Sequence, residues 1–496
     1  MKKKSESVFI ISVVIALFVI VYGLFANDTL AAVSGAIMAW VSDKFGWLYV
    51  LSVFLFMAFL LWIACSKYGK IKLGRDDETP KYSNFNWFAM LFCGGTGIGL
   101  VFWSIAEPLS HYVSPPEGIT AGTREAAEFS IRTVFLHWGV TQWACFAVVG
   151  LGIAYFQFRR NRNAQISNLL SPLVGERATV GAFGKAIDIF SIVVSVAGVA
   201  TSLGLGVSQI CGGLNYLFAI PNTKTTWFVI IFAITALFLT SSVSGIDRGI
   251  KVLSRVNTWL ALALLALAFG VGPRVSMLNT FVNGMGQHLQ NLIGDTLMIN
   301  EFGDNTWVMN WRVFYYAWFI AWTPFVGMFI AEISRGRTIR EFIFGVVLAP
   351  TAFTIIWLSV FGTIALKATG TYSLETLGQL VASPETAVFK IFSEYPLSRV
   401  ISGLIVVLLA IFFTTSADSA TYSLSVMSSD GNTNPPIYKK VVWALIEASI
   451  AFLLLSAGSL KPLQTISIAA SLPFLFIMLA MCPALVMEMK REKRWQ

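Results

Sequence analysis

Four aromatic residues in one apolar stretch have the spacing expected of a cation-binding surface. They are Tyr315, Trp318, Phe319 and Trp322. The spacing is i, i+3, i+4 and i+7, so a helix would present all four rings on one face. Such a wall attracts quaternary ammonium groups by cation–π interaction, worth about 0.5–2 kcal/mol per ring. A second aromatic set, earlier in the chain, comprises His137, Trp138, Trp143 and Phe146. Packing between helices is the alternative interpretation of both sets.

Hydroxyl-bearing residues in a later apolar stretch could hold a hard cation such as sodium. The stretch contains Phe412-Phe413-Thr414-Thr415-Ser416-Ala417-Asp418-Ser419. Carbonyls near Cys93 and Thr96 would add oxygen ligands if the backbone is unwound there, as in sodium-coupled transporters with discontinuous helices. The alternative is that Thr415 and Ser416 bond carbonyls of their own helix. Asp418 is expected near the cytoplasmic end, where it could lie in the membrane interface.

The remaining polar residues do not predict an enzyme. The sequence has no nucleophile–base pair or metal-binding box, and the glycines at 94–99 lack the lysine of a phosphate loop. His137 could carry a proton, or it could make a structural hydrogen bond beside Trp138. Glu107, just before Pro108, is interpreted as a helix-end or gate residue. We expect no cofactor and a gradient of ions or solute as the energy source.

Two interruptions of predicted helices lie near these residues. The segment Cys93-Gly94-Gly95-Thr96-Gly97-Ile98-Gly99 has four glycines, which remove the restriction that keeps a helix regular. Pro324 has no N–H group and would clash with the carbonyl of Ile320. Non-helical backbone at membrane depth is tolerated where protein or a watery cavity satisfies it, so the two breaks together predict a binding site. Close helix packing at the glycines and a simple kink at the proline are the alternatives.

The elements that position these residues are predicted to be membrane helices. Of the 496 residues, 56% are hydrophobic and 12% are charged, whereas about a quarter are charged in soluble proteins. One crossing of the bilayer needs about 20 apolar residues. Stretches of this kind predict about twelve transmembrane helices, at 8–26, 46–65, 86–109, 132–157, 184–213, 225–244, 254–273, 310–333, 342–366, 398–420, 440–457 and 463–487.

The distribution of charge predicts the orientation in the membrane. The net charge is +9, and the basic residues cluster in alternate connecting segments, among them 67–81, 159–162, 335–340 and 490–494. This is the positive-inside pattern, which predicts a bacterial cytoplasmic membrane protein with both termini in the cytoplasm and no nucleic-acid partner. The five cysteines lack metal-type spacing, so neither disulfides nor zinc are expected.

The two breaks divide the chain into a repeated layout. Residues 1–85 hold two N-terminal helices, 86–277 a first group of five, and 310–487 a second group of five. Each group begins with its interrupted stretch. Because five is odd, the second group is expected to be inverted, with the binding site near the midplane. An amphipathic run in 278–309 is expected on the outer surface, and 488–496 form a short cytoplasmic tail.

Together, several motifs resemble the betaine/choline/carnitine transporter family over nearly the whole chain. They are Gly95-Thr96-Gly97-Ile98-Gly99 with Glu107-Pro108, His137-Trp138-Gly139 with Trp143, Thr201-Ser202-Leu203-Gly204-Leu205-Gly206, Tyr316-Ala317-Trp318 through Gly327, Ile333-Ser334-Arg335-Gly336-Arg337, and Thr415-Ser416-Ala417-Asp418. The resemblance implies an all-α integral membrane protein of twelve transmembrane helices, with a LeuT-type 5+5 inverted repeat behind two extra N-terminal helices. It also implies a homotrimer in membrane lipid that imports trimethylammonium compounds.

The resemblance implies roles for individual residues as well. Positions matching Trp318, Phe319 and Trp322 form the substrate's aromatic box in sodium-coupled betaine carriers. The sodium site is implied at Cys93, Thr96, Phe412, Thr415 and Ser416. A weaker second sodium site is implied at Thr201, Ser202 and Phe325. The candidate substrate site further includes Tyr315, Trp138, Trp143, Phe146, Gly95, Gly97 and Gly99.

Three positions favour coupling to sodium. Gly99 stands where proton-coupled choline carriers tend to have Asp, and Asn257 and Val326 stand where the sodium-independent carnitine exchanger has Arg and Met. We therefore predict a sodium-coupled importer of glycine betaine or a related trimethylammonium solute that works by alternating access. A choline carrier, coupled to protons or sodium, and a carnitine carrier are the alternatives within the family. The departures from the family pattern are Phe319 for a frequent Trp, Phe146 for a frequent Tyr and Glu332 for a frequent Arg.

Two other classes of protein fit the sequence less well. A channel would need a continuous polar path, a ring of charged residues or a carbonyl filter, and no such repeat is found in the sequence. A membrane enzyme would need catalytic groups that can be assigned roles. A carrier is therefore the predicted class.

Overall fold

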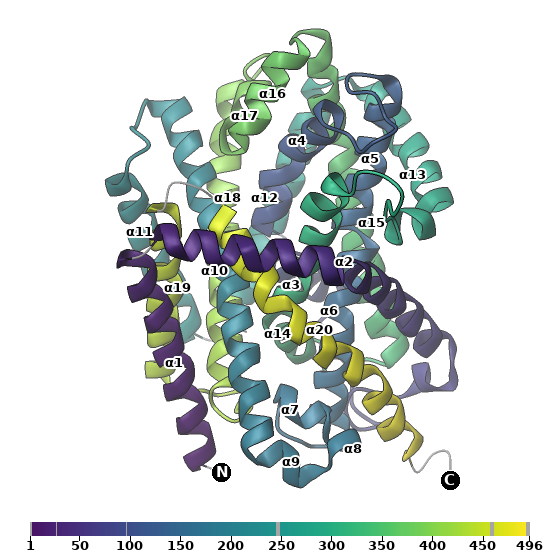
Figure 1. Ribbon diagram of the computed structural model, residues 1–496, viewed down its shortest axis with the longest axis vertical. Coiled ribbons are helices and arrows are strands. Elements are labelled where there is room, and N and C mark those ends of the chain that lie inside the picture. Colours follow the sequence, from purple (N-terminus) through teal and green to yellow (C-terminus); the bar gives the residue numbers. More distant parts are fainter. Residues whose placement is uncertain (1, 26, 96, 245–248, 457–460, 493–496) are drawn as a thin grey trace.

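A computed structural model describes residues 2–25, 27–95, 97–244, 249–456 and 461–492. Within these ranges the chain is helical and forms no strand; the only β-type pairing is an isolated bridge between Lys72 and Thr338. The all-α class predicted from the apolar stretches is therefore confirmed for the part of the chain described (Figure 1).

The longer helices account for most of the described chain. They are α1 (Lys2–Phe25), α2 (Asn27–Cys65), α3 (Asn84–Gly95), α4 (Gly97–Val113), α5 (Arg124–Trp138), α6 (Val140–Ala154), α10 (Ala182–Phe218), α11 (Lys224–Ser244), α12 (Ile250–Val271), α13 (Arg274–Thr296), α14 (Phe314–Ile333), α15 (Ile339–Lys367), α18 (Ser398–Met427), α19 (Ile437–Ser456) and α20 (Lys461–Lys490). The shorter elements are α7 (Ile166–Leu169), α8 (Ser171–Val174), α9 (Glu176–Val180), α16 (Leu374–Ala382), α17 (Pro384–Phe392), the 3₁₀ turns η1 (Lys67–Lys70) and η4 (Ala368–Gly370), and the π-helical turns η2 (Tyr155–Arg159) and η3 (Val308–Val313).

The apolar helices make the chain a multi-pass membrane protein. Among the described residues, nine helices are long and apolar enough to cross a bilayer, and α3 with α4 would add a tenth as one bent span. All twelve stretches predicted from the sequence coincide with a helix or a helix pair. α19 is not counted among them because it carries three charged residues, Lys439, Lys440 and Glu447, within its 20 residues. The count of twelve spans therefore remains a prediction.

The first predicted break lies where the glycines indicated, whereas the second does not. α3 ends at Gly95 and α4 begins at Gly97, and their axes differ by 63°. In contrast, α14 continues through Pro324, so the prediction of an interrupted helix at this proline is wrong. The carbonyl of Ile320, which a proline at this position leaves without its helical donor, accepts a hydrogen bond of 2.7 Å from Thr323 Oγ1 instead. The irregular backbone comes earlier, in the π-helical turn η3.

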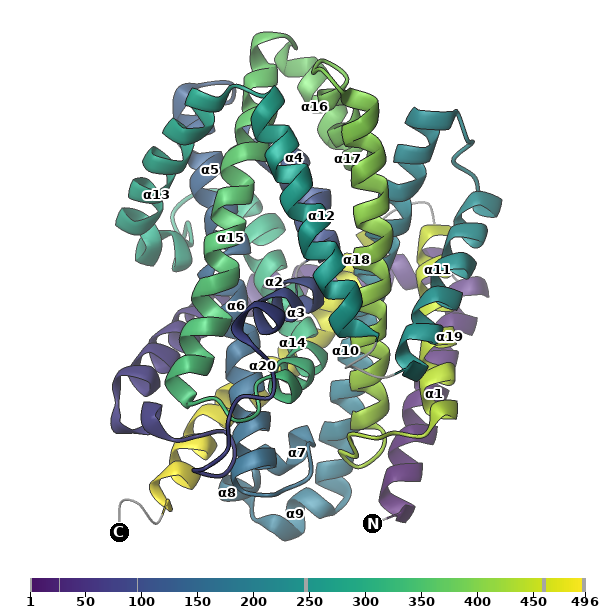
Figure 2. The same ribbon diagram turned by 180° about the vertical axis from the view of Figure 1, so that it is seen from behind.

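The helix with the aromatic face lies in the centre of the bundle. α14 is surrounded by α3, α6, α10, α18 and α20, and the most apolar window of its span is completely buried. α4 contacts α5, α10, α15 and α18 beside it. α2 and α20 cross the other helices obliquely and contact each other (Figures 1 and 2). The core of the molecule is thus formed where the two predicted groups of helices meet.

The connecting segments gather at two opposite ends of the molecule. α7 to α9, the start of α1 and the end of α20 lie at one end, and α16 and α17 lie at the other (Figure 1). The segment predicted to be amphipathic forms α13, which packs against α5 and α15. Its outward face carries exposed Val275, Leu278, Val282, Leu289 and Ile293. The helix begins at Arg274, a little before the predicted boundary of 278.

Candidate substrate and cation site

The aromatic face of α14 forms as its spacing predicts. The four rings, Tyr315, Trp318, Phe319 and Trp322, are each at most 5% exposed. The ring centroids of Tyr315 and Phe319 are 5.6 Å apart, and those of Trp318 and Trp322 are 5.9 Å apart. Most neighbouring rings meet edge to face, the arrangement that aromatic quadrupoles prefer. The result is a continuous aromatic surface on the most deeply buried helix.

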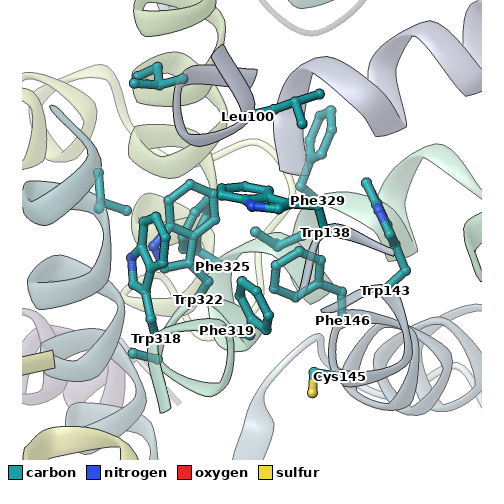
Figure 3. Packing of buried hydrophobic residues seen from close by; sticks show 14 of the residues in the cluster. Leu100, Trp138, Trp143, Cys145, Phe146, Trp318, Phe319, Trp322, Phe325 and Phe329 are labelled. Carbon is teal, nitrogen blue, oxygen red and sulfur yellow. The ribbon is translucent and has the colours of Figure 1, made fainter. Parts of the chain in front are cut away.

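Rings from α5 and α6 face this surface. Trp138 lies 5.7 Å from Tyr315 and 6.1 Å from Trp318 between ring centroids. Phe146 lies 6.4 Å from both Phe319 and Trp322. Trp143 is placed further out, 5.7 Å from Phe146. The structure therefore brings the two aromatic sets together into one cluster (Figure 3).

The glycines of the break let the backbone approach these rings. A Cβ atom at Gly95 would lie 2.6 Å from Trp143, and one at Gly99 would lie 2.7 Å from Trp138. At Gly97 the same atom would lie 2.0 Å from the ring of Phe412 on α18. Since real Cβ contacts of this length essentially never occur, a side chain at any of the three positions would force the facing ring or its helix to shift. The close-packing interpretation of the glycines thus applies at the candidate site itself.

A buried carboxylate orients the aromatic cluster. Glu107 lies inside α4 and accepts hydrogen bonds from Trp138 Nε1 at 2.7 Å and from Tyr315 Oη at 2.6 Å. Its other oxygen pairs with His137 Nδ1 at 2.7 Å and His111 Nε2 at 3.3 Å. The interpretation of Glu107 as a helix-end residue is wrong, because its partners come from α4, α5 and α14 and enclose it. One carboxylate therefore fixes two rings of the candidate substrate site.

The histidines around Glu107 act as structural partners in this arrangement. The ring of His137 stacks on Tyr315 with a centroid distance of 4.3 Å. The contact and its bond to Glu107 match the structural alternative weighed for His137. No role is predicted from the sequence for His111, which lies one helical turn after Glu107 and is fully buried. The i, i+4 spacing of a carboxylate and a histidine in an apolar helix is the signal that could have identified it.

The candidate sodium ligands lie where α3, α4 and α18 meet. Ser416 Oγ donates to the carbonyl of Cys93 at 3.4 Å, and the Phe412 ring contacts Gly97. Thr415 Oγ1 donates to carbonyls of its own helix, those of Ile411 and Phe412. Carbonyl and hydroxyl oxygens are the ligand types that a hard cation takes, so this donor set fits sodium. Thr96, the remaining candidate, lies outside the described residues.

The candidates for a second cation site are less closely connected. Thr201 Oγ1 donates to Ala197 in its own helix at 3.0 Å, as a packing hydroxyl would. The carbonyl of Phe325 accepts from Ser423 Oγ at 3.0 Å. Ser202 is buried in α10, and its hydroxyl has no hydrogen-bond partner among the described residues. α10 reaches the aromatic cluster through Trp322, whose Nε1 donates to the carbonyl of Gly198 at 2.9 Å.

Asp418 is buried inside the protein, and its place relative to the membrane interface stays a prediction. Its side chain is fully buried between α18 and α11 and accepts a hydrogen bond from Ser241. Glu447 on α19 is also buried and accepts from Thr421 at 2.9 Å. Lys440 approaches from the start of α19 and donates to the carbonyl of Ser242 at 2.7 Å. These polar residues form a separate group from the aromatic cluster.

The fold and the site together define a class of protein. A multi-pass bundle whose buried centre is an aromatic cluster, with hydroxyl and carbonyl oxygens beside a bent helix, is the architecture of a membrane transporter for small solutes. Comparison with known proteins identifies the family. Residues 7–494 match the model described as BCCT, betaine/carnitine/choline family transporter. The chain belongs to this family.

Three relatives are similar over nearly their whole lengths. The chain is 44% identical to the glycine betaine transporter OpuD of Bacillus subtilis, with 100% of this chain and 96% of the relative covered. It is 43% identical to a probable glycine betaine transporter of Desulfitobacterium hafniense, with 99% and 98% covered. It is 40% identical to the ectoine/hydroxyectoine transporter of Virgibacillus pantothenticus, with 99% and 98% covered. The family and these relatives are transporters, and no catalytic activity is indicated.

Proposed function

We propose that the protein imports glycine betaine or a related trimethylammonium solute, coupled to sodium, by alternating access. The observation that carries the proposal is the aromatic cluster formed by Trp138, Trp318, Phe319 and Trp322. Its rings offer π-faces to a quaternary ammonium group, which cannot donate N–H hydrogen bonds. Glu107, the carboxylate that accepts hydrogen bonds from Trp138 and Tyr315, is already occupied by four donors. Cation–π attraction is therefore the main source of affinity for the ammonium group.

The arrangement of the helices supports the coupling part of the proposal. The carbonyl of Cys93 and the hydroxyl groups of Ser416 and Thr415 adjoin the bent α3–α4 pair, which also carries Gly99 against Trp138. An ion bound there would stabilise the same backbone segment that contacts the substrate rings. Sodium and solute would thus favour one another's binding, because both stabilise the same conformation. A LeuT-type repeat of two inverted groups of five helices, behind α1 and α2, is the proposed framework.

Uptake into proteoliposomes tests both parts of the function. We expect saturable uptake of labelled glycine betaine that needs an inward sodium gradient and stops when potassium replaces sodium. Undiminished uptake without sodium would exclude sodium coupling, and uptake driven by a pH gradient alone would indicate proton coupling. Competition by choline, carnitine and ectoine in the same assay identifies the substrate. The second candidate substrate class is ectoine, because one full-length relative is named for it.

The assembly and orientation follow as further proposals. We propose a homotrimer in the bacterial cytoplasmic membrane, with both termini in the cytoplasm. Basic residues cluster in the predicted cytoplasmic connections, and the described ends of α1 and α20 lie at the same end of the molecule (Figure 1). Labelling of single cysteines placed at position 3 and position 490 in intact cells tests the orientation. Modification of either by a membrane-impermeant reagent would contradict it.

A further inference from the structure

Arg312 is a buried charge whose guanidinium has no hydrogen-bonding partner among the described residues. It lies in the π-helical turn η3, one turn before Tyr315, and its exposed fraction is 0%. None of its three side-chain nitrogens has a hydrogen-bond partner, and it takes part in no described ion pair. An arginine cannot relieve this situation by losing its proton. A buried charge without an acceptor is costly, so the guanidinium requires an acceptor from outside the described chain.

The two nearest carboxylates are already engaged elsewhere. Glu107 accepts four hydrogen bonds from the aromatic cluster and its histidines. Asp295, at the end of α13, forms an ion pair of 2.7 Å with Arg132. Both act on Arg312 through space but neither bonds to it. The N–H donors of Arg312 are therefore left for an additional acceptor.

A second unused donor lies beside the guanidinium. The ring of Trp307 stands 5.5 Å from the guanidinium carbon of Arg312, and its Nε1 has no hydrogen-bond partner among the described residues. The two side chains thus combine a fixed positive charge with N–H donors from Trp307, which precedes η3, and from Arg312 within it. Such a set of donors without acceptors is suited to an anion and not to a cation.

The charge of Arg312 also argues against the competing interpretation of this region as a metal site. Glu107, His111 and His137 have ligand atoms within 4.8 Å of one another, which a metal ion could bridge. Arg312 is close enough to act electrostatically on both histidines. A divalent cation placed among them would be repelled by the guanidinium and would displace the hydrogen bonds that orient Trp138 and Tyr315. An anion at Arg312 would be attracted by the guanidinium and would leave the hydrogen bonds of Trp138 and Tyr315 in place.

We propose that Arg312, with Trp307, forms a binding site for a small monovalent anion at the start of α14. The anion is either free chloride or the carboxylate of a zwitterionic solute. The carboxylate source rests on the proposed function. Three residues, about 4.5 Å of helical rise, separate Arg312 from Tyr315, the first ring of the aromatic face. A solute whose carboxylate and ammonium groups are this far apart would contact Arg312 and Tyr315 together.

The first arm of the test measures chloride binding by the full-length protein in detergent. The melting temperature of wild type is followed as chloride replaces gluconate at constant ionic strength. We expect a saturable rise in wild type, a weaker dependence in Arg312→Lys, which keeps the charge, and none in Arg312→Gln. The control is Arg124→Gln, whose arginine is 90% exposed in a surface pair with Glu128. It should keep the response of wild type.

The second arm measures the binding of glycine betaine and of choline in gluconate buffer. If the solute carboxylate is the anion, Arg312→Gln weakens glycine betaine binding by about tenfold or more and leaves choline unchanged, since a charge-assisted hydrogen bond is lost only for the former. If chloride is the anion, the melting temperature of wild type rises with chloride, and Arg312→Gln changes the affinities for glycine betaine and choline to the same extent. Equal behaviour of wild type and Arg312→Gln in both arms overturns the proposal.

Two complications leave the test decisive. If Arg312→Gln does not fold, two measurements replace it: the chloride titration of wild type and the ratio of glycine betaine affinity to choline affinity in Arg312→Lys. The proposal is overturned if chloride has no saturable effect and this ratio equals that of wild type. If wild type binds neither solute, the proposed function fails and the anion site is then judged on the chloride arm alone.

Discussion

At the scale of single residues, the candidate site depends on a carboxylate that orients two of its rings. Glu107 orients Trp138 and Tyr315 by accepting their hydrogen bonds. Glu107→Gln would replace one carboxylate oxygen by an NH₂ group, which cannot accept a hydrogen bond from these partners. We expect weaker solute binding, by about tenfold, and a loss of about 1–3 kcal/mol of stability from the unsatisfied partners. Tryptophan fluorescence titration and thermal unfolding measure the two effects. Glu125→Gln, at an exposed position of α5, is the matched control; equal effects of the two substitutions would exclude the orienting role.

The rings themselves give a second prediction at this scale. Trp318→Ala and Trp322→Ala each remove one π-face from the cluster, which corresponds to about a 2- to 30-fold loss of solute affinity per ring. Equilibrium binding of labelled glycine betaine measures the loss, and Trp318→Phe should retain part of the affinity. Trp259→Ala is the control because its ring is 59% exposed on α12. Unchanged affinity in both buried variants would rule out the aromatic site.

The residues of the site differ in how far they can be predicted from sequence. Helical spacing alone places Tyr315, Trp318 and Trp322 on one face, because it is a local property of α14. The role of Glu107 could not be predicted in this way, since its bond to Tyr315 joins positions 208 residues apart. Arg312 was missed for a related reason: that its side chain lacks a partner is visible only after every neighbour has been placed.

At the scale of elements, the bent α3–α4 pair connects the aromatic cluster with the candidate sodium ligands. A methyl group at Gly97 would meet the Phe412 ring at 2.0 Å, so Gly97→Ala must displace this ring or one of the helices α4 and α18. We expect at least a tenfold loss of uptake and a higher sodium requirement, measured as uptake against sodium concentration. Gly270→Ala on α12 is the control, because nothing lies within 4 Å of the added atom. A sodium dependence identical to wild type in Gly97→Ala would contradict the connection.

The two predicted breaks show where sequence reasoning about elements succeeds and where it does not. Several glycines in a short segment lower the helical propensity of the backbone itself, so the bend between Gly95 and Gly97 follows from local composition. A single proline removes one hydrogen bond, and a neighbouring hydroxyl can replace it. Thr323 does so for the carbonyl of Ile320, and α14 stays helical. Proline in a membrane helix is therefore weaker evidence of a break than clustered glycine.

At the scale of the whole molecule, a polar network joins the segment that follows α20 to distant parts of the chain. Glu492 forms an ion pair of 2.9 Å with Arg159 and accepts from Tyr155 at 3.0 Å, and Arg159 also pairs with Asp76 at 2.9 Å. Burial opposes ionisation of Glu492, but the bonds from Arg159 and Tyr155 outweigh it and hold its pKa below the ordinary value of 4.5. The ionised carboxylate therefore stabilises the folded protein.

This network predicts a pH-dependent difference in stability. Because the pKa of Glu492 is lowered by folding, its contribution is present above about pH 4.5 and is lost as the pH falls through the folded-state pKa. Glu492→Gln should lower stability at pH 7 by about 1–2 kcal/mol, and the difference from wild type should shrink below pH 4.5. Thermal unfolding at several pH values measures it. Glu176→Gln, which removes an exposed carboxylate paired with the partly buried Arg162, should change little at any pH.

The length of α2 has a consequence for the membrane around the protein. With 39 residues it is about 58 Å long, nearly twice the roughly 30 Å thickness of the hydrocarbon core, so it must lie tilted or extend along the surface. It contacts α6 from the first predicted group and α15 and α20 from the second. Any rotation of one group of helices against the other would change the tilt of α2, which contacts both. The energy of that tilt depends on bilayer thickness, so the rate of uptake should differ between vesicles of different acyl-chain length.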